Sequence, residues 1–345
     1  MRQYTRWMSK TKISVIITAY NRKDFLIQAI ESVINQIYDP LSFEIVVVTN
    51  FSVDLVNYQA DYQLKSILMD GNIGEFLYAG IIATTHPIIA FLDDDDTFKS
   101  MKLHRLDEIF SENPKLCYYH NELIYVDINI RTLYYVRLIE KKPTFSNGNT
   151  TILDAKSNFG NLKHVLENRG DFNLSSIAIR RESYLEYLPL LKQIKSNQDG
   201  FFFWTGLISM WQMMIDDMKL VNYRVHDLNV SRQLDFMAKS LELQKQIYTY
   251  DLILSFLEEL NYQSNNIESL RRWILLYKYE YELMFLVFAF SSRVTILKQI
   301  KKLLSNGMSY SNTLKYHSLL FAIMGFISRK FAQKVYLIMR HVTHM

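Results

Sequence analysis

The sequence is poor in cysteine, proline and glycine. Cys117 is the single cysteine among 345 residues, so the chain forms no internal disulfide and no site built from several of its own thiolates, as in zinc or iron–sulfur proteins. Five prolines and ten glycines exclude collagen-like and linker-rich chains. With 49% apolar and 21% charged residues, the chain is also not a disordered one. Its length predicts one large domain with an appendage, or two domains.

Long hydrophobic runs are absent as well. The longest, Leu283–Phe290 and Leu319–Ile327, are much shorter than the ~18–20 residues that a transmembrane helix needs. No apolar segment follows the charged residues near Met1, so we expect no signal peptide. One cysteine fits a reducing compartment. These features predict a cytoplasmic protein.

Negative charge is scarce at one end of the chain. Residues 273–345 have a formal charge of +8 and residues 1–272 have −4, within a total of +4. A basic surplus confined to one end of an acidic body argues against nucleic acid as the partner. A basic helical end rich in apolar residues is also typical of segments that lie on anionic membranes.

What the sequence does contain, over its first ~100 residues, is an alternation of strand and helix patterns. Short runs rich in β-branched residues predict strands buried on both faces, at 13–18, 43–48, 64–69 and 88–92. Helical patterns lie between them, at 26–34 and 74–85. This alternation predicts an α/β fold with a mostly parallel sheet and flanking helices. Ligands of such sheets bind beyond the carboxyl ends of the strands, so the loops after Thr18, Val48 and Leu92 should converge.

Four consecutive aspartates, Asp93 to Asp96, follow the last of these strands. Adjacent carboxylates repel one another unless a cation neutralises them. Oxygen ligands of this kind suit Mg²⁺ or Mn²⁺, which typically bind a few carboxylates and substrate phosphates together. A solvated acidic turn is the alternative, which the position at a buried strand end disfavours.

Five segments in register resemble glycosyltransferase family 2, whose members have the GT-A fold and transfer sugars from nucleotide donors with inversion. They are SVIITAYNR (14–22), AIESVINQ (29–36), FEIVVV (43–48), NIG (72–74) and IAFLDDDD (89–96). The resemblance is clear to about residue 100, resumes near Gln198-Asp199 and Tyr223–Ser231, and does not cover the last ~100 residues.

The resemblance implies roles for residues at matching positions. Asp93, Asp95 and Asp96 would bind Mn²⁺ or Mg²⁺, and His226 would be a further metal ligand or phosphate contact. The residues implied in binding the nucleotide sugar are Thr18, Ala19, Tyr20, Arg22, Asn50, Asn72, Gly74, Asp93 and Asp94. Asp199 matches the catalytic base that takes a proton from the acceptor hydroxyl. Two structural alternatives stay open: Asp199 as an ordinary helix N-cap, and His226 as a strand-end histidine.

The sequence departs from the family pattern in three places. Thr49-Asn50 stands where the family usually has two acids, and an asparagine can both donate and accept hydrogen bonds, which leaves the nucleobase open. Gln198 replaces the glutamate that usually precedes the base. Ala79-Gly80 replaces an Arg-Asn pair. A donor linked to UDP or GDP remains the expectation.

The expected organisation is a GT-A catalytic domain over 1–235 and a helical region over 236–345. Within the catalytic domain, 1–100 would bind the nucleotide and 100–235 the acceptor, a glycan or a lipid-linked molecule. Strands are expected at 118–120, 123–126, 174–180 and 220–226, a loop at 146–149, and a helix opening at Asn197. Four aromatic residues are expected to be either core side chains or sugar contacts: Tyr118, Tyr119, Phe201 and Trp204.

The helical end permits contact with a membrane, packing on the catalytic domain, or a homodimer surface. The residues that suggest the membrane are Lys298, Lys301, Lys302, Arg329, Lys330, Lys334, Arg340, Phe326, Phe331 and Tyr336.

Three other functions are alternatives to an inverting, metal-assisted glycosyltransferase. A nucleotidyltransferase usually has a glycine-rich loop after its first strand, and Ala19–Arg22 has no glycine. A scaffold with a decayed site agrees with Asn50 and Gln198 but not with the retained Asp93, Asp95 and Asp199. Nucleic-acid binding would rest on the pI of about 8.8 alone.

Overall fold

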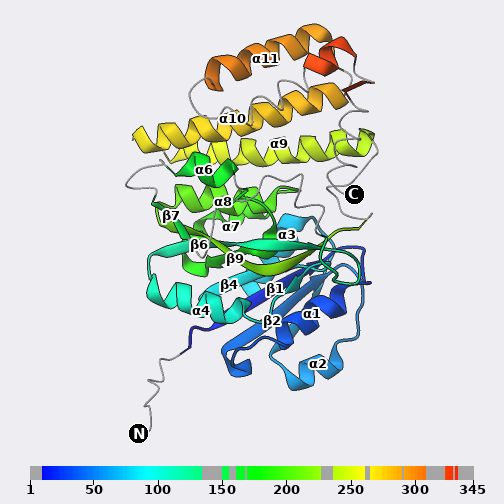
Figure 1. Cartoon of the computed structure of the whole chain (residues 1–345), viewed down its shortest axis with the longest axis vertical. Coiled ribbons are helices and arrows are strands. Elements are labelled where there is room, and N and C mark those ends of the chain that lie inside the picture. Colours follow the sequence, from blue (N-terminus) through cyan, green and yellow to red (C-terminus); the bar gives the residue numbers. More distant parts are fainter. Residues whose placement is uncertain are drawn as a thin grey trace.

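The computed structural model describes residues 10–133, 150–154, 161–167, 169–226, 236–260, 265–289, 291–307, 323–328 and 331–332. Its strands form one curled sheet, in the order β3-β2-β1-β4-β8-β6-β9-β5, with β7 paired to β9 (Figure 1). The strands are β1 (Ile13–Ala19), β2 (Phe43–Thr49), β3 (Leu64–Leu68), β4 (Ile88–Asp93), β5 (Thr97–Phe98), β6 (Leu116–Val126), β7 (Thr150–Asp154), β8 (Ile177–Arg180) and β9 (Gln212–Arg224).

The first half of the sheet is parallel, as the sequence predicts. β1 pairs with β2 and β4, and β2 pairs with β3, all in parallel. Both faces of β1 are buried: Val15 and Ile17 join the core cluster that includes α1 (Leu26–Ile34), whereas Ile16 joins the one that includes α3 (Ile73–Ala83). Because the chain runs outward from β1 through β2 to β3 and then returns to β4, the strand order reverses between β1 and β4. A ligand crevice is expected at such a reversal.

The second half of the sheet is mixed and corrects three boundaries. The two expected pieces at 118–126 are one strand, β6. Only Ile177–Arg180 of the run at 174–180 is a strand, because Asn173, at a φ of 73°, bends the chain into a short 3-10 helix over Leu174–Ser176. The last strand, β9, begins at Gln212 and ends at Arg224, so His226 lies beyond it. The loop expected at 146–149 lies outside the described residues.

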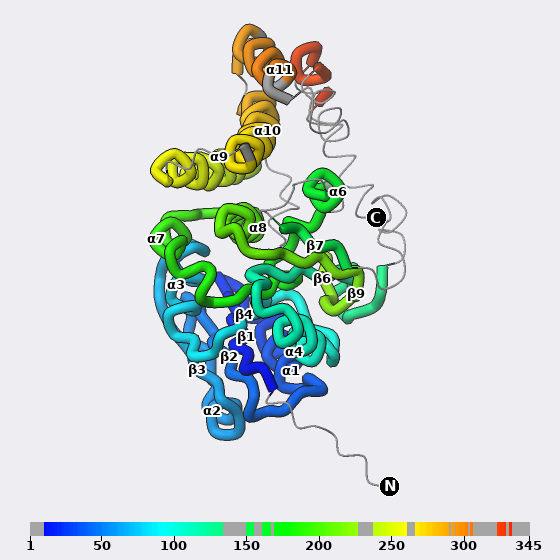
Figure 2. Tube along the Cα trace, turned by 90° about the vertical axis from the view of Figure 1, so that its left-hand side faces the viewer, coloured from blue at the N-terminus to red at the C-terminus, as the bar shows by residue number. Residues whose placement is uncertain are grey.

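Helices cover both faces of the sheet and form a further layer above it (Figures 1 and 2). Those not yet given are α2 (Val56–Asp61), α4 (Lys102–Glu112), α6 (Leu162–Glu167), α7 (Leu188–Leu191), α8 (Gln198–Ile208), α9 (Phe236–Glu259), α10 (Asn265–Phe288) and α11 (Arg293–Gly307). Among the described residues, no helix combines the length and the apolar character needed to cross a membrane.

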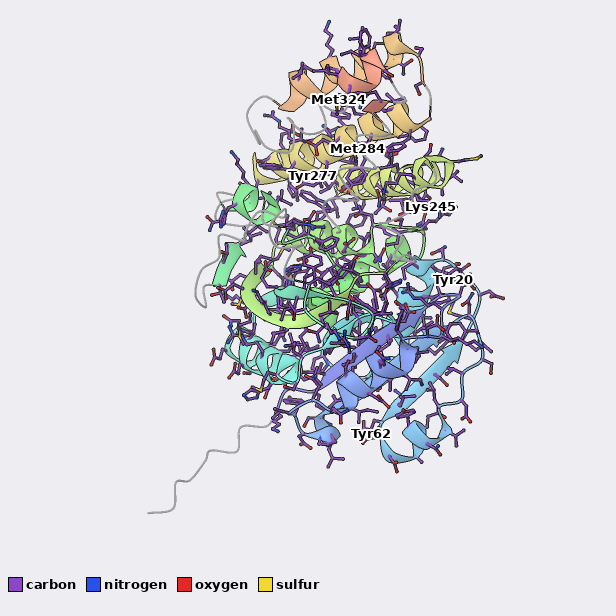
Figure 3. The ribbon with its side chains drawn as sticks, turned by 45° about the vertical axis from the view of Figure 1, so that its right-hand side comes forward. Tyr20, Tyr62, Lys245, Tyr277, Met284 and Met324 are labelled. Carbon is purple, nitrogen blue, oxygen red and sulfur yellow. The ribbon has the colours of Figure 1, made fainter. Side chains whose placement is uncertain are left out.

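The helical layer shares one hydrophobic core with the sheet. Trp204 of α8 packs edge-on against Tyr277 of α10, with ring centroids 5.4 Å apart, and Thr249 Oγ1 of α9 donates to the Ser196 carbonyl at 2.7 Å. Figure 3 shows Tyr277 and Met284 within this layer. Tyr118, Tyr119, Phe201 and Trp204 are fully buried. These four aromatic rings are therefore core side chains and present no surface to a sugar.

One buried carboxylate joins β1, β2, β3 and the loop before β4. Glu44 is 2% exposed and accepts hydrogen bonds from Ser14 Oγ (2.6 Å), Lys65 Nζ (2.8 Å) and the backbone N and Oγ1 of Thr85 (2.6 and 2.9 Å). Burial alone would raise the pKa of Glu44, but the hydrogen bonds outweigh it and lower the pKa from 4.5 to about 2. The ionised form is therefore the one that stabilises the sheet.

We expect Glu44→Gln to lower the free energy of unfolding by about 3 kcal/mol near neutral pH, since each pKa unit corresponds to ~1.4 kcal/mol. A lowered folded-state pKa stabilises above the unfolded pKa and is lost as pH falls, so the difference from the native chain should shrink between about pH 5 and about pH 2. Urea unfolding at several pH values measures it. The exposed Glu112→Gln is the control, and an equal effect there would contradict the assignment.

Candidate functional site

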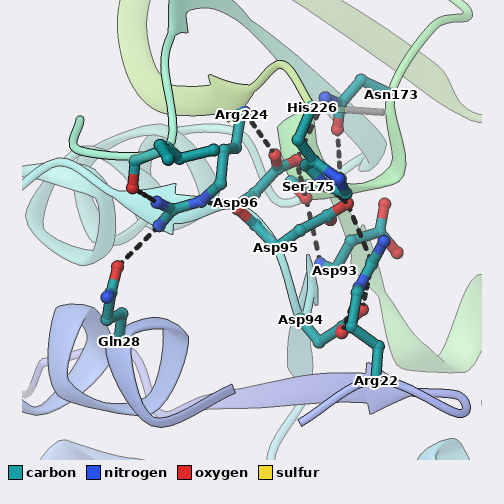
Figure 4. Close-up of polar contacts among 11 residues, drawn as sticks. Arg22, Gln28, Asp93, Asp94, Asp95, Asp96, Asn173, Ser175, Arg224 and His226 are labelled. Carbon is teal, nitrogen blue, oxygen red and sulfur yellow. Dashed lines mark hydrogen bonds and ion pairs between the residues drawn. The ribbon is translucent and has the colours of Figure 1, made fainter. Parts of the chain in front are cut away.

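The ends of β1 and β4 meet where the strand order reverses. Thr18 lies opposite Asp93 in the sheet, and the backbone N of Asp94 donates to the Thr18 carbonyl at 3.2 Å. The two loops that leave these strands, at Tyr20–Arg22 and Asp94–Asp96, are thereby held together. Figure 4 shows the polar side chains that fill this junction.

Arg22 is the link between the two loops. Its guanidinium binds Asp94 through two parallel hydrogen bonds, at 2.7 and 2.6 Å, and reaches Asp95 Oδ2 at 2.8 Å. The side chains of Arg22, Asp94 and Asp95 are 17%, 6% and 10% exposed, so the charges interact largely out of water. The carboxylates raise the pKa of Arg22 further above its usual range, against the opposing effect of its burial. A lysine cannot provide this forked geometry.

Asp95 and His226 form the second contact of the site. His226 Nε2 lies 3.0 Å from Asp95 Oδ2, although 131 residues separate them in sequence. The imidazole ring packs against Phe25, with centroids 5.3 Å apart. Asp95 Oδ2 therefore lies within hydrogen-bond distance of both the His226 imidazole and the Arg22 guanidinium.

Asp96 points the other way and is buried. Its Oδ2 accepts from Ser175 Oγ at 2.7 Å and from Asn173 Nδ2 at 3.3 Å, and its Oδ1 accepts from the backbone N of Arg224 at 3.0 Å (Figure 4). Ser175 Oγ also accepts from the backbone N of Asp93 at 3.0 Å. Asp96 therefore fixes the backbone of the acidic loop, while Asp95 faces His226.

Arg224 is a site residue outside the sequence-predicted set, although it lies within the segment 223–231 that resembles the family. It is 1% exposed and stacks over Phe25, 4.2 Å from the ring centroid. Its Nε donates to the Asp95 carbonyl at 2.7 Å, and one terminal nitrogen donates to Gln28 Oε1 of α1 at 2.8 Å. The adjacency to His226 was the signal that could have identified it.

Crowding changes the acidity of three of the aspartates. Burial, followed by the charge of neighbouring aspartates, raises the pKa of Asp93 well above its usual range and that of Asp96 to about 8. Burial also raises the pKa of Asp94 to about 6, although Arg22 opposes the shift. Added positive charge here would restore the ionised forms.

Asp199 lies at the first turn of α8 and is tied to the acidic loop through Asn173. Its Oδ2 accepts from the backbone N of Asn173 at 3.1 Å and its Oδ1 from the N of Gly200 at 3.0 Å. Asn173 therefore contacts both Asp199 and Asp96. Burial raises the pKa of Asp199 above its usual value, and Asp171 nearby has its pKa raised to about 7 by burial and by the charge of Asp199. Sequence reasoning selected neither Asn173 nor Asp171.

The remaining candidates divide into two groups. Asn50 and Asn21 form a reciprocal pair: Asn50 Oδ1 accepts from the Asn21 backbone N at 2.8 Å, and Asn50 Nδ2 donates to Asn21 Oδ1 at 2.6 Å. Tyr20, which is 57% exposed, packs edge-on against Phe76. Tyr20 follows β1 and Asn50 follows β2, and each has surface open to a ligand, whereas Ala19 is fully buried.

Asn72 and Gly74 have structural roles at the start of α3. Asn72 and Glu75 form a capping box, with each side chain accepting from the other's backbone N. A Cβ at position 74 would lie 2.0 Å from the Leu191 carbonyl oxygen, so only glycine allows this contact. Neither side chain contacts the acidic loop.

The donor set suits a divalent cation that binds jointly with phosphate. Within the described residues, no three His, Cys, Asp or Glu side chains converge as a complete metal site. Asp95 and His226 supply one oxygen and one nitrogen, and Mg²⁺ or Mn²⁺ commonly takes its other ligands from water and substrate phosphates. The raised pKa values of Asp93, Asp94 and Asp96 reflect a lack of positive charge in this junction, which a divalent cation would supply.

Comparison with known proteins shows what this chain is similar to. Residues 14–170 match the model of the family described as glycosyl transferase family 2. This part of the chain is similar to glycosyltransferase family 2. An uncharacterised glycosyltransferase of Nostoc sp. is 37% identical over 131 residues, which are 35% of this chain and 39% of that protein. The succinoglycan biosynthesis protein ExoO of Rhizobium meliloti is 35% identical over 102 residues, 28% of this chain and 29% of that one. The matches thus span well under half of these relatives.

Solved structures of glycosyltransferases share the fold along nearly the whole chain. TarS 1–349 of S. aureus, in complex with UDP-GlcNAc, aligns with a TM-score of 0.52 at 13% identity, over 87% of this chain and 91% of that one. The mannosyltransferase PcManGT of Pyrobaculum calidifontis, in complex with GDP-Man and Mn²⁺, aligns with a TM-score of 0.55 at 12% identity, over 97% and 85%. This α/β architecture with C-terminal helices is the one that the family resemblance implied.

Ser175→Ala tests how far the acidic loop depends on its hydrogen bonds. Ser175 is fully buried, donates to Asp96 and accepts from the backbone N of Asp93, so its removal leaves two buried groups without this partner and should cost roughly 1.5–3 kcal/mol of unfolding free energy. Ser183→Ala is the matched control, because Ser183 donates to the neutral Arg180 carbonyl at 2.7 Å and should cost about 1 kcal/mol. Urea unfolding of both variants measures the difference, and equal losses would contradict it.

Proposed function

We propose that this protein transfers a sugar from a nucleoside-diphosphate sugar to an acceptor hydroxyl, with inversion and with the assistance of a divalent cation. One observation carries the proposal: the cluster of Arg22, Asp95 and His226 lies at the reversal between β1 and β4, and Asn173 ties Asp199 to it. The match of residues 14–170 to the family model supports the reaction type.

Asp199 is the proposed general base. Each oxygen of its carboxylate accepts from one backbone N–H group, so its position is defined before the acceptor arrives. As the acceptor oxygen attacks the anomeric carbon, Asp199 takes the hydroxyl proton and the bond between that carbon and the diphosphate oxygen breaks. The raised pKa makes Asp199 a stronger base than an exposed aspartate. Attack opposite to the leaving diphosphate inverts the anomeric centre.

Asp95 and His226 are the proposed protein ligands of Mn²⁺ or Mg²⁺, with Asp93 next to them at the end of β4. When bound, the cation supplies Lewis-acid stabilisation of the diphosphate charge. Arg22 holds Asp94 and orients Asp95, and Asp96 with Arg224 fixes the loop backbone. These side chains keep the loop in one conformation without help from the substrate.

The donor is proposed to be linked to UDP or GDP, since the fold neighbours bind UDP-GlcNAc and GDP-Man. Asn50, oriented by Asn21, is placed to contact the base with one remaining N–H and one acceptor lone pair. The acceptor is proposed to be a glycan or a lipid-linked molecule. We propose that residues 1–235 form the catalytic domain and that residues 236–345 form its helical extension. The cytoplasm is the proposed location.

A nucleotide-sugar-binding scaffold is the second candidate. It is favoured by Asn50, an amide that stands where the family usually has an acid, and by Gln198 before Asp199. Both candidates bind the donor, and only the enzyme turns it over.

Asp199→Asn separates the two candidates. In an enzyme, loss of the base should lower turnover by about 10²–10⁴-fold and leave donor affinity within a few-fold. Release of nucleoside diphosphate measures turnover, and calorimetry measures affinity. The exposed Asp61→Asn of α2 is the control for a lost carboxylate, and melting curves check folding. Unchanged turnover in the Asp199 variant would exclude its role as base.

Thermal shift with UDP or GDP, each with Mn²⁺, Mg²⁺ or EDTA, tests the cation. A ligand at ten times its Kd adds about 1.4 kcal/mol to folding stability. We expect one nucleotide to raise the Tm only with metal present, and Asp95→Asn, but not Asp61→Asn, to remove the rise. A rise of equal size in EDTA would argue against metal assistance, and no rise with any nucleotide would argue against a nucleotide site.

A further inference from the structure

The outward face of α11 mixes apolar and basic side chains. Val294, Leu297 and Leu304 are 61%, 49% and 38% exposed, and Lys298 and Lys301 are exposed between them. At 100° per residue, these five side chains fall within an arc of ~120°. An apolar stripe on a surface helix normally faces the core, so its outward position needs an explanation.

The opposite face of α11 is already anchored to α10. Ile296 is fully buried, and Gln299 Nε2 donates to Glu282 Oε2 of α10 at 2.6 Å. The Lys302 ammonium lies 4.4 Å from the ring centroid of Tyr279. These contacts fix the rotation of the helix about its axis. The outward stripe is therefore a defined surface rather than a consequence of loose packing.

A second apolar row lies beside α11. Ile323, Ile327 and Phe331 recur at every fourth residue and are 44%, 69% and 55% exposed. Both views of the molecule place this segment next to α11, at the end of the molecule opposite α2 (Figures 1 and 2). Its inner side is packed: Ala332 is fully buried, and a Cβ at Gly325 would lie 2.8 Å from the Val287 side chain. The apolar surface thus extends across two segments.

The charge of this end of the chain selects the occupant. Residues 293–345 contain nine lysines and arginines and no acidic residue. Two copies meeting through this surface would place these positive charges against each other. A soluble polyanion would use the lysines but leave the apolar rows in water. An anionic lipid surface satisfies both, because apolar side chains enter the acyl boundary and lysines reach the headgroups.

We propose that the outward face of α11, together with Ile323, Ile327 and Phe331, docks on an anionic phospholipid membrane. The catalytic domain then stands on the membrane through its helical layer, with α2 at the far end. The proposal does not depend on sugar transfer, and its test needs neither donor nor acceptor.

Co-sedimentation of the full chain with vesicles tests the proposal. We expect binding to vesicles of equal phosphatidylglycerol and phosphatidylcholine, weakened by salt, and little binding to phosphatidylcholine alone. Val294→Glu with Leu297→Glu should lower the affinity for the anionic vesicles by at least about tenfold, as should Lys298→Gln with Lys301→Gln, since each basic residue near the surface contributes ~1 kcal/mol.

Matched controls lie elsewhere on the molecule. Val56→Glu places the same substitution on α2, where Val56 is 68% exposed, and Lys115→Gln with Lys195→Gln removes the same charge from exposed sites. Both should bind as the native chain does. Melting curves check folding, and Val294→Ser with Leu297→Ser replaces the glutamate variant if that one unfolds.

Four results would overturn the proposal. The first is no binding of the native chain to the anionic vesicles. The second is an equal loss in the controls. The third is binding to inorganic polyphosphate that competes fully with vesicles and is insensitive to the Val294 and Leu297 substitutions. The fourth is a concentration-dependent dimer in sedimentation that the same two substitutions abolish.

Discussion

The interaction on which the site depends is the contact of two arginines with the loop of four consecutive aspartates. Arg22 reaches the acidic loop from the end of β1, and Arg224 reaches it from the end of β9. Without these guanidinium groups, the carboxylates would repel one another in a partly buried junction, and the loop would have no single conformation. The raised pKa values of Asp93, Asp94 and Asp96 indicate that further positive charge would be favourable there, and this is one basis of the cation site that we propose.

The sequence was sufficient to predict the half of the site built on parallel strands. The apolar runs of β1 and β4 predict adjacent buried strands, and adjacency brings Arg22 to Asp94 and Asp95. Ser175, Asn173 and Arg224 were beyond this reasoning. Ser175 and Asn173 reach Asp96 because β8, which follows them, pairs antiparallel with β4 and β6, and Arg224 reaches it because β9 pairs with β6. Nothing in the irregular run around Asn173 indicates that insertion.

The same limit explains the misplaced strand ends. Asp216 interrupts the apolar pattern of β9, so the sequence gives no sign that the strand begins at Gln212. In the structure Asp216 is 1% exposed and accepts from Tyr119 Oη at 2.8 Å and Arg105 Nε at 2.9 Å. Its partners lie about 100 residues away. Long-range pairing of this kind makes a charged residue acceptable inside a strand, and a local pattern cannot reveal it.

The helical layer is part of the same folded unit as the site. α9 and α10 share a core with α8, whose first turn carries Asp199, and Ser196 just before that turn contacts Glu242 and Thr249 of α9. These contacts join the helical layer to the segment that carries Asp199.

We propose that Asp95 and His226 form only part of a metal site, which donor phosphates complete. Electron paramagnetic resonance of Mn²⁺ tests it directly, by counting free and bound cation in the presence and absence of UDP or GDP. We predict weak binding of Mn²⁺ to the protein alone, and about one tightly bound Mn²⁺ per chain when the matching nucleotide is added. Tight binding without nucleotide, or no binding with either, would contradict the account.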